Sequence, residues 1–237
     1  MRKILIAVII VLSVLLIYLG FKDEEIYYFS IGDYLSRGIT PYGNNDYGYS
    51  DYIKDYISDN DKLETYVNYS KKNLRTIDLI KDIEDNVKIE VDGKSKTIQN
   101  GLIKADLVTL SIGMNDLLDN VKFDNDFSIN DLYDKFEEVL VDYEKLFELL
   151  REYCKEEIVL IGLYNSLGNE SLNEFFEYAN QKLYNLSNSY DIKYVNIYED
   201  FKNSEYFDNS RIYPNKLGYE LIYRKVIDTI DENVIKD

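Results

Sequence analysis

The chain has 237 residues, 46% of them hydrophobic, so it can bury one sizeable core, and its length favours a single folded domain. Its 44 acidic and 27 basic residues give a formal net charge of -17, which repels nucleic-acid phosphates, and we expect no nucleic-acid partner. The sequence has no histidine and one cysteine, Cys154, which excludes an intramolecular disulfide and a zinc site of clustered Cys and His. We expect no metal and no cofactor.

The N-terminus is typical of a membrane anchor. Arg2 and Lys3 precede the apolar residues 4–21, which as a helix would extend about 27 Å, just enough to cross a bilayer core. No small-residue cleavage site follows, which favours an uncleaved signal anchor over a cleaved signal peptide. Because basic flanks stay in the cytoplasm, we expect the rest of the chain to lie outside the cell membrane. The predicted parts are an anchor (1–21), a linker (22–25) and a folded domain (26–237).

Strand-like and helix-like segments alternate after the linker, which predicts a parallel sheet in an α/β fold. Most strand-like segments are apolar throughout, as strands covered on both faces are. The predicted strands are 26–31, 63–67, 107–112, 158–162 and 194–197. The predicted helices are 49–58, 76–86, 129–153, 172–189 and 216–233. Asp92-Gly93, between alternating apolar and polar residues, predicts a hairpin outside this order.

Three distinctive stretches occur near the ends of these segments. "IGDYLSRG" follows the first strand, "SIGMND" follows the third main strand, and "RIYPNKLGYE" precedes the last helix. The loops beyond the carboxyl ends of parallel strands form the ligand crevice of such a sheet. The three stretches therefore predict one common site.

These stretches, with "NYSKKNLRTIDLI", resemble in order the four motif blocks of the SGNH/GDSL hydrolase family, and most closely its bacterial membrane-anchored members. The resemblance covers residues 26–230. It implies a flavodoxin-like three-layer sandwich with a five-stranded parallel sheet. It also implies ester hydrolysis by a serine nucleophile, a histidine base and an aspartate that orients the histidine.

The residues that this family uses for catalysis are replaced here. Tyr34 stands at the serine position, Tyr213 at the histidine position and Ser210 at the aspartate position. At the positions that hold the oxyanion, the resemblance gives Asn73 in place of a glycine, whereas Asn115 is retained. The framework residues that match the family are Gly32, Asp33, Gly38, Gly113, Asp116, Pro214, Asn215 and Gly218.

Another group could in principle supply the missing chemistry. A tyrosine hydroxyl is ionised in only about one molecule in a thousand at pH 7, so Tyr34 would need a cation or base, and Arg37 and Lys72 are the candidates. Ser36 is an alternative nucleophile, although we interpret it as a small helix-capping residue. Asp33 is interpreted as a turn residue that accepts backbone hydrogen bonds.

The leading hypothesis is a catalytically degenerate, membrane-anchored, extracytoplasmic member of the family with a binding or accessory role in the cell envelope. The alternatives are an active esterase or lipase-type acyl-ester hydrolase with a non-standard nucleophile, and a protein-interaction scaffold. We expect Tyr34 and Tyr213 to face each other, with Ser210, Asn73 and Asn115 nearby. Their rings either form a surface for a cell-wall glycan or peptide, or pack together and close the pocket.

Overall fold

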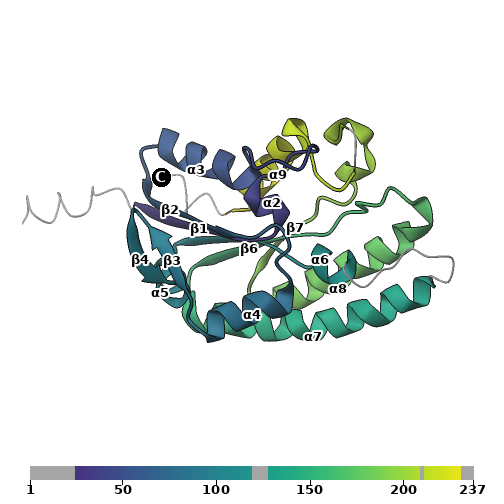
Figure 1. Cartoon of the computed structure of the whole chain (residues 1–237), viewed down its shortest axis with the longest axis horizontal. Coiled ribbons are helices and arrows are strands. Elements are labelled where there is room, and N and C mark those ends of the chain that lie inside the picture. The colour runs from purple at the N-terminus through teal and green to yellow at the C-terminus, as the bar shows by residue number, and fades with distance from the viewer. Residues whose placement is uncertain (1–24, 119–127, 209–210, 231–237) are drawn as a thin grey trace, which may run out of the picture.

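A five-stranded sheet between two layers of helices forms the folded part of the chain (Figure 1). The structure, a computed structural model, describes residues 25–118, 128–208 and 211–230. The strands run parallel in the order β2-β1-β5-β6-β7. Their bounds are β1 (Ile26–Gly32), β2 (Leu63–Ser70), β5 (Leu107–Ser111), β6 (Glu157–Ile161) and β7 (Lys193–Val195). The predicted parallel α/β sheet is confirmed.

Helices α3 and α9 cover one face of the sheet, and α4, α5, α7 and α8 cover the other (Figure 1). The bounds are α2 (Tyr34–Arg37), α3 (Tyr49–Asp59), α4 (Thr76–Glu84), α5 (Ile98–Lys104), α6 (Met114–Leu118), α7 (Ile129–Tyr153), α8 (Asn173–Ser189) and α9 (Lys216–Thr229). Short 3-10 helices are η1 (Glu170–Leu172), η2 (Asp200–Lys202) and η3 (Ser204–Tyr206). The predicted hairpin is confirmed as antiparallel β3 (Lys88–Val91) and β4 (Lys94–Thr97).

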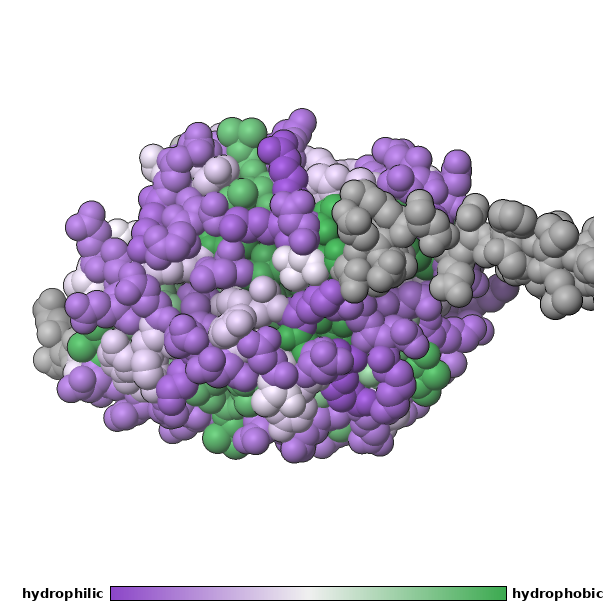
Figure 2. All heavy atoms as spheres, turned by 180° about the vertical axis from the view of Figure 1, so that it is seen from behind, coloured by the Kyte–Doolittle hydropathy of each residue, from purple (hydrophilic) through white to green (hydrophobic). Residues whose placement is uncertain are grey.

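The core lies on both faces of the sheet. Every residue of β1 and of β5 is buried, in agreement with their apolar sequences. The long helix α7 presents one apolar stripe to the sheet, because its buried residues recur every three or four positions. Those residues are Leu132, Phe136, Val139, Tyr143, Leu146, Phe147 and Leu150. Outside the core, hydrophilic residues cover most of the face shown in Figure 2, consistent with the formal charge of -17.

Strand β1 is the switch point of the sheet, because it lies between β2 on one side and β5 on the other. Its last residue, Gly32, has φ +149°, and a Cβ atom there would lie 2.1 Å from the Ser111 carbonyl oxygen at the end of β5. Only glycine allows two strand ends to approach this closely. The loops that leave β1 and β5 therefore emerge side by side, where this fold places its ligand crevice.

Two groups of sequence-based predictions lie outside the described residues. The first is the anchor at 1–21 together with most of the linker, and the second is Ser210. Across residues 25–118, 128–208 and 211–230, no helix combines the length and apolar character that crossing a membrane requires.

Candidate functional site

Asp33 organises the turn between β1 and α2. Its carboxylate accepts hydrogen bonds from the Leu35 amide (3.0 Å) and the Ser111 hydroxyl (2.9 Å), and its side chain caps α2. The residue is 1% exposed. Burial raises the pKa of this carboxyl to about 7, although the two hydrogen bonds lower it in part. Asp33 thus occupies the turn position inferred for it and ties the ends of β1 and β5 together.

Tyr34 occupies the first turn of α2 and is 2% exposed. Its ring packs edge to face against Tyr213, with 5.2 Å between ring centroids and 73° between the planes. Within the described part of the chain, its hydroxyl has no partner in hydrogen-bonding geometry. Burial, followed by the neighbouring Tyr164 and Asp33, raises the pKa of Tyr34 well above its ordinary value. The phenol therefore stays neutral at physiological pH, at the position where the resemblance places the nucleophile.

Neither candidate cation is placed to ionise Tyr34. Arg37 donates from Nε to Asn45 Oδ1 (3.1 Å) and from Nη1 to the Ser70 carbonyl oxygen (2.9 Å). The ammonium of Lys72 lies 5.1 Å from the ring centroid of Tyr213, in a cation–π contact. Tyr213 is half-buried, and it lies between the buried Tyr34 ring and the Lys72 side chain.

Ser36 is a structural residue, but the predicted capping role is wrong because Asp33 caps α2 and Ser36 lies inside the helix. The Ser36 side chain is fully buried. Its Oγ donates to the Ile31 carbonyl oxygen (3.0 Å) and lies 2.8 Å from both the Tyr49 and Ser111 hydroxyls. A hydroxyl that holds β1, β5 and α3 together is inaccessible to a substrate.

Asn115, to which the resemblance assigns an oxyanion role, uses its amide group inside the protein. Its Nδ2 donates to the carbonyl oxygens of Lys72 (3.1 Å) and Leu74 (2.9 Å), which flank the exposed Asn73. Asn73 and Asn115 are thus brought close together, as the resemblance implies. Because both amide hydrogens of Asn115 are engaged, this side chain offers no donor to an oxyanion.

Asp116 connects the same loop to α4. Its carboxylate accepts hydrogen bonds from the Thr76 amide (3.0 and 3.1 Å) and the Thr76 hydroxyl (3.1 Å), and so stabilises the start of α4. Burial raises the pKa of Asp116 to about 6, against the effect of these bonds. This framework residue is structural.

The last motif begins α9. The Asn215 side chain caps this helix by accepting a hydrogen bond from the Gly218 amide (3.1 Å), and its Nδ2 donates to the Glu205 carbonyl oxygen (2.8 Å). Pro214 is buried beside it, and a Cβ on Gly218 would lie 2.7 Å from Pro214 Cβ. Asn215, Pro214 and Gly218 therefore fix the start of α9 immediately after Tyr213, the residue that the resemblance places at the histidine position.

Three buried tyrosines complete the site and were missed from the sequence. Tyr143 donates to the Ile112 carbonyl oxygen (2.6 Å) and lies against Gly113 (φ +102°), where a Cβ would be 2.1 Å from the Tyr143 oxygen. Tyr164 donates to the Ile212 carbonyl oxygen, and Tyr219 to that of Ile39 (2.7 Å). Two of them carried a usable signal, because Tyr164 lies just past the end of β6 and Tyr219 lies in the stretch RIYPNKLGYE. Tyr143 lies within a long helix whose sequence gives no indication of the site.

The strand order, the switch-point turn after β1 and the helix-capping asparagine before α9 together define a flavodoxin-like α/β framework. Among the residues that the structure describes, no group of three or more Cys, Asp or Glu is arranged to hold a metal ion. The family model for GDSL-like lipase/acylhydrolase matches residues 28–226, and the chain belongs to this family.

The chain is also similar to other proteins in sequence or in fold. The uncharacterized protein YpmR of Bacillus subtilis (strain 168) is 29% identical over 229 residues, which cover 87% of this chain and 82% of that protein. Among solved structures, the lipase Lip_vut3 from a goat rumen metagenome has a TM-score of 0.72 at 22% identity, covering 85% of this chain and 96% of that one. Axe2, an acetylxylan esterase from Geobacillus stearothermophilus, has a TM-score of 0.67 at 16% identity, with coverages of 91% and 99%. The two structures share the fold.

Proposed function

We propose that this protein is a catalytically inactive GDSL-like hydrolase, anchored in the cell membrane with its folded domain outside, which acts by binding in the cell envelope. The observation that carries the proposal is Tyr34, a buried neutral phenol at the position of the nucleophile. A weakly nucleophilic hydroxyl needs a base of near-neutral pKa, and the chain has no histidine to supply one.

The surroundings of Tyr34 support the same proposal. Ser36, the alternative nucleophile, is buried and uses its hydroxyl to join β1, β5 and α3. The amide of Asn115 is engaged by two backbone carbonyls. The proposal therefore rests on the replaced nucleophile and base together with an engaged Asn115 side chain, while Asp33, Asp116 and Asn215 still stabilise the fold. Retention of the framework without the chemistry favours a binding role, for which a cell-wall glycan or peptide is the proposed ligand.

The first test is reactivity toward serine-hydrolase probes. We expect the purified full-length chain not to be labelled by a fluorophosphonate and not to hydrolyse short-chain acyl esters at enzyme rates. Loss of the triad leaves at best an acceleration of about 10³ to 10⁴ over water in well-studied cases, and the oxyanion donor is also engaged here. Ester turnover that survives Tyr34→Phe and disappears in Ser36→Ala would instead identify an active esterase whose nucleophile is Ser36.

The second test concerns topology. Arg2 and Lys3 before the apolar residues 4–21 favour an anchor whose following residues, 22–237, lie outside the membrane. We expect protease added to intact cells to remove the folded domain, as shown by immunoblotting with a cytoplasmic protein as control for cell integrity. A domain that is cleaved only after the membrane has been permeabilised would contradict this orientation.

A further inference from the structure

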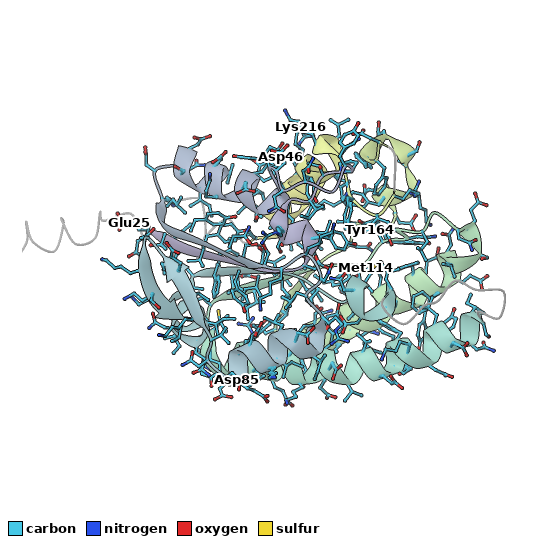
Figure 3. All side chains as sticks on the ribbon, viewed as in Figure 1. Glu25, Asp46, Asp85, Met114, Tyr164 and Lys216 are labelled. Atoms are coloured by element: carbon cyan, nitrogen blue, oxygen red, sulfur yellow. The ribbon has the colours of Figure 1, made fainter. Side chains whose placement is uncertain are left out.

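A pocket of about 430 Å³ opens beside the degenerate site, between the loop of residues 40–47, α3 and the start of α9. Its volume is within the range of about 300–1,000 Å³ usual for ligand pockets. Asp46 and Lys216 lie near each other on this side of the molecule (Figure 3). The lining residues are Thr40, Pro41, Asp46, Tyr47, Tyr52, Pro214, Asn215, Lys216 and Tyr219. Tyr219 connects the pocket to the degenerate site, because its hydroxyl donates to the Ile39 carbonyl oxygen (2.7 Å) and lies 3.5 Å from the Tyr34 carbonyl oxygen.

One side of this pocket is aromatic. Tyr47, 38% exposed, packs edge to face on Tyr52 with 4.7 Å between ring centroids. The row continues across α3 and α9, from Tyr52 to Tyr223 (5.9 Å) and from Tyr223 to Tyr56 (6.1 Å). Rings that support one another in this way form a rigid surface with apolar faces and hydroxyl tips.

The polar groups of the pocket have unused hydrogen-bonding capacity. The Asp46 carboxylate has no hydrogen-bond or ion-pair partner among the described residues. The Lys216 side chain is 77% exposed and lies 3.8 Å from Glu220. Thr40 Oγ1 accepts from the Asn44 amide and keeps its own hydrogen to donate. Burial, then Glu220 and Asp46, raises the pKa of Tyr52, so its hydroxyl remains protonated.

We propose, on the basis of the binding role proposed above, that this pocket binds a neutral oligosaccharide. A sugar ring has apolar C–H faces that fit tyrosine rings, and hydroxyl groups that both donate and accept hydrogen bonds at its edge. The pocket offers this combination of rings and hydrogen-bonding groups, and the Lys216 ammonium at its edge is paired with Glu220. An anionic ligand is disfavoured by Asp46 and by the net charge of -17. In this proposal the ligand binds in the pocket beside Tyr34, because the Tyr34 ring itself is buried.

The test is calorimetric titration of the full-length chain, in a detergent without a sugar headgroup, with cellohexaose, xylohexaose and chitohexaose. We expect saturable binding of at least one of them. Tyr47→Ala and Asp46→Ala should each weaken that binding about tenfold. Tyr184→Ala is the matched control and should leave it unchanged, because Tyr184 is also exposed (47%) and edge to face with another tyrosine, Tyr194 (6.0 Å), but lies on α8.

The controls separate this proposal from the proposed function. Melting temperatures of the three variants show whether a loss of binding reflects unfolding. Absence of binding for all three oligosaccharides, or binding that Tyr47→Ala leaves unchanged, overturns the oligosaccharide site. Stronger binding of a proline decapeptide than of any sugar overturns it in favour of a peptide ligand. Each of these results leaves the catalytic proposal intact, because that proposal fails only if the fluorophosphonate or ester assay is positive.

Discussion

Replacement of Tyr34 by alanine is expected to lower the free energy of unfolding by about 3–5 kcal/mol, the usual cost of truncating a buried aromatic ring. The ring is 2% exposed and packs against Tyr213 just beyond the carboxyl end of β1, so its removal leaves a cavity and exposes apolar neighbours. Urea denaturation of the wild-type and variant chains measures the difference. The result matters for function because it shows whether the former nucleophile position is now part of the core.

Two other variants make this expectation specific. Tyr34→Phe should be within about 1 kcal/mol of the wild type, because the hydroxyl that it removes is buried without a hydrogen-bond partner among the described residues. Tyr213→Ala should cost less than Tyr34→Ala, because Tyr213 is only half-buried. If Tyr34→Phe were as destabilising as Tyr34→Ala, the hydroxyl rather than the ring would be the important group.

The free energy of unfolding is expected to fall as the pH rises from about 4 to about 7, by up to roughly 4 kcal/mol from Asp33 alone. The pKa of this carboxyl is about 7 in the folded protein and 3.8 ordinarily. Between pH 3.8 and about pH 7 the folded chain keeps the Asp33 proton, whereas the unfolded chain releases it. The stabilisation of the folded state by this proton is therefore complete below pH 3.8, and it is lost as the pH rises to about 7. Asp116, with a folded pKa of about 6, acts in the same direction.

Denaturation curves at pH 5, 6, 7 and 8 measure this dependence. Asp33→Asn removes the titrating carboxyl but keeps an oxygen that can accept the Leu35 amide, so its stability should vary less over this range. Asp134→Asn is the control, because Asp134 is exposed on α7. Asp134→Asn should keep the pH dependence of the wild type. The expectation fails if Asp33→Asn keeps it as well.

Much of the framework could be predicted because its signals are local. Apolar runs marked the five sheet strands, and the periodicity of residues 129–153 gave the bounds of α7. Helices α2, α5 and α6 were not predicted because they have seven or fewer residues, too few for periodicity to distinguish them from loops. The end of β2 was also set three residues too early, since its polar residues after Val67 interrupt the apolar pattern.

The positions of the candidate site were predictable from motif order, whereas their hydrogen-bond partners were not. Nothing local indicates that the Asn115 amide binds carbonyls more than 40 residues away in sequence, or that Ser36 contacts Ser111. Tyr164 reaches the site from the loop after β6, and Tyr219 reaches it from α9, through packing of the whole domain. Such contacts follow from tertiary structure. A single sequence therefore predicts which residues lie at the site, but it does not predict their hydrogen-bond partners.

The two hydrogen bonds of Asn115 bear on any attempt to engineer ester hydrolysis into this chain. The Asn115 amide is committed to the carbonyls on either side of Asn73, so it could reach an oxyanion only if that loop moved. A serine at position 34 and a histidine at position 213 would therefore not suffice, and the loop of residues 72–74 would have to be redesigned together with them.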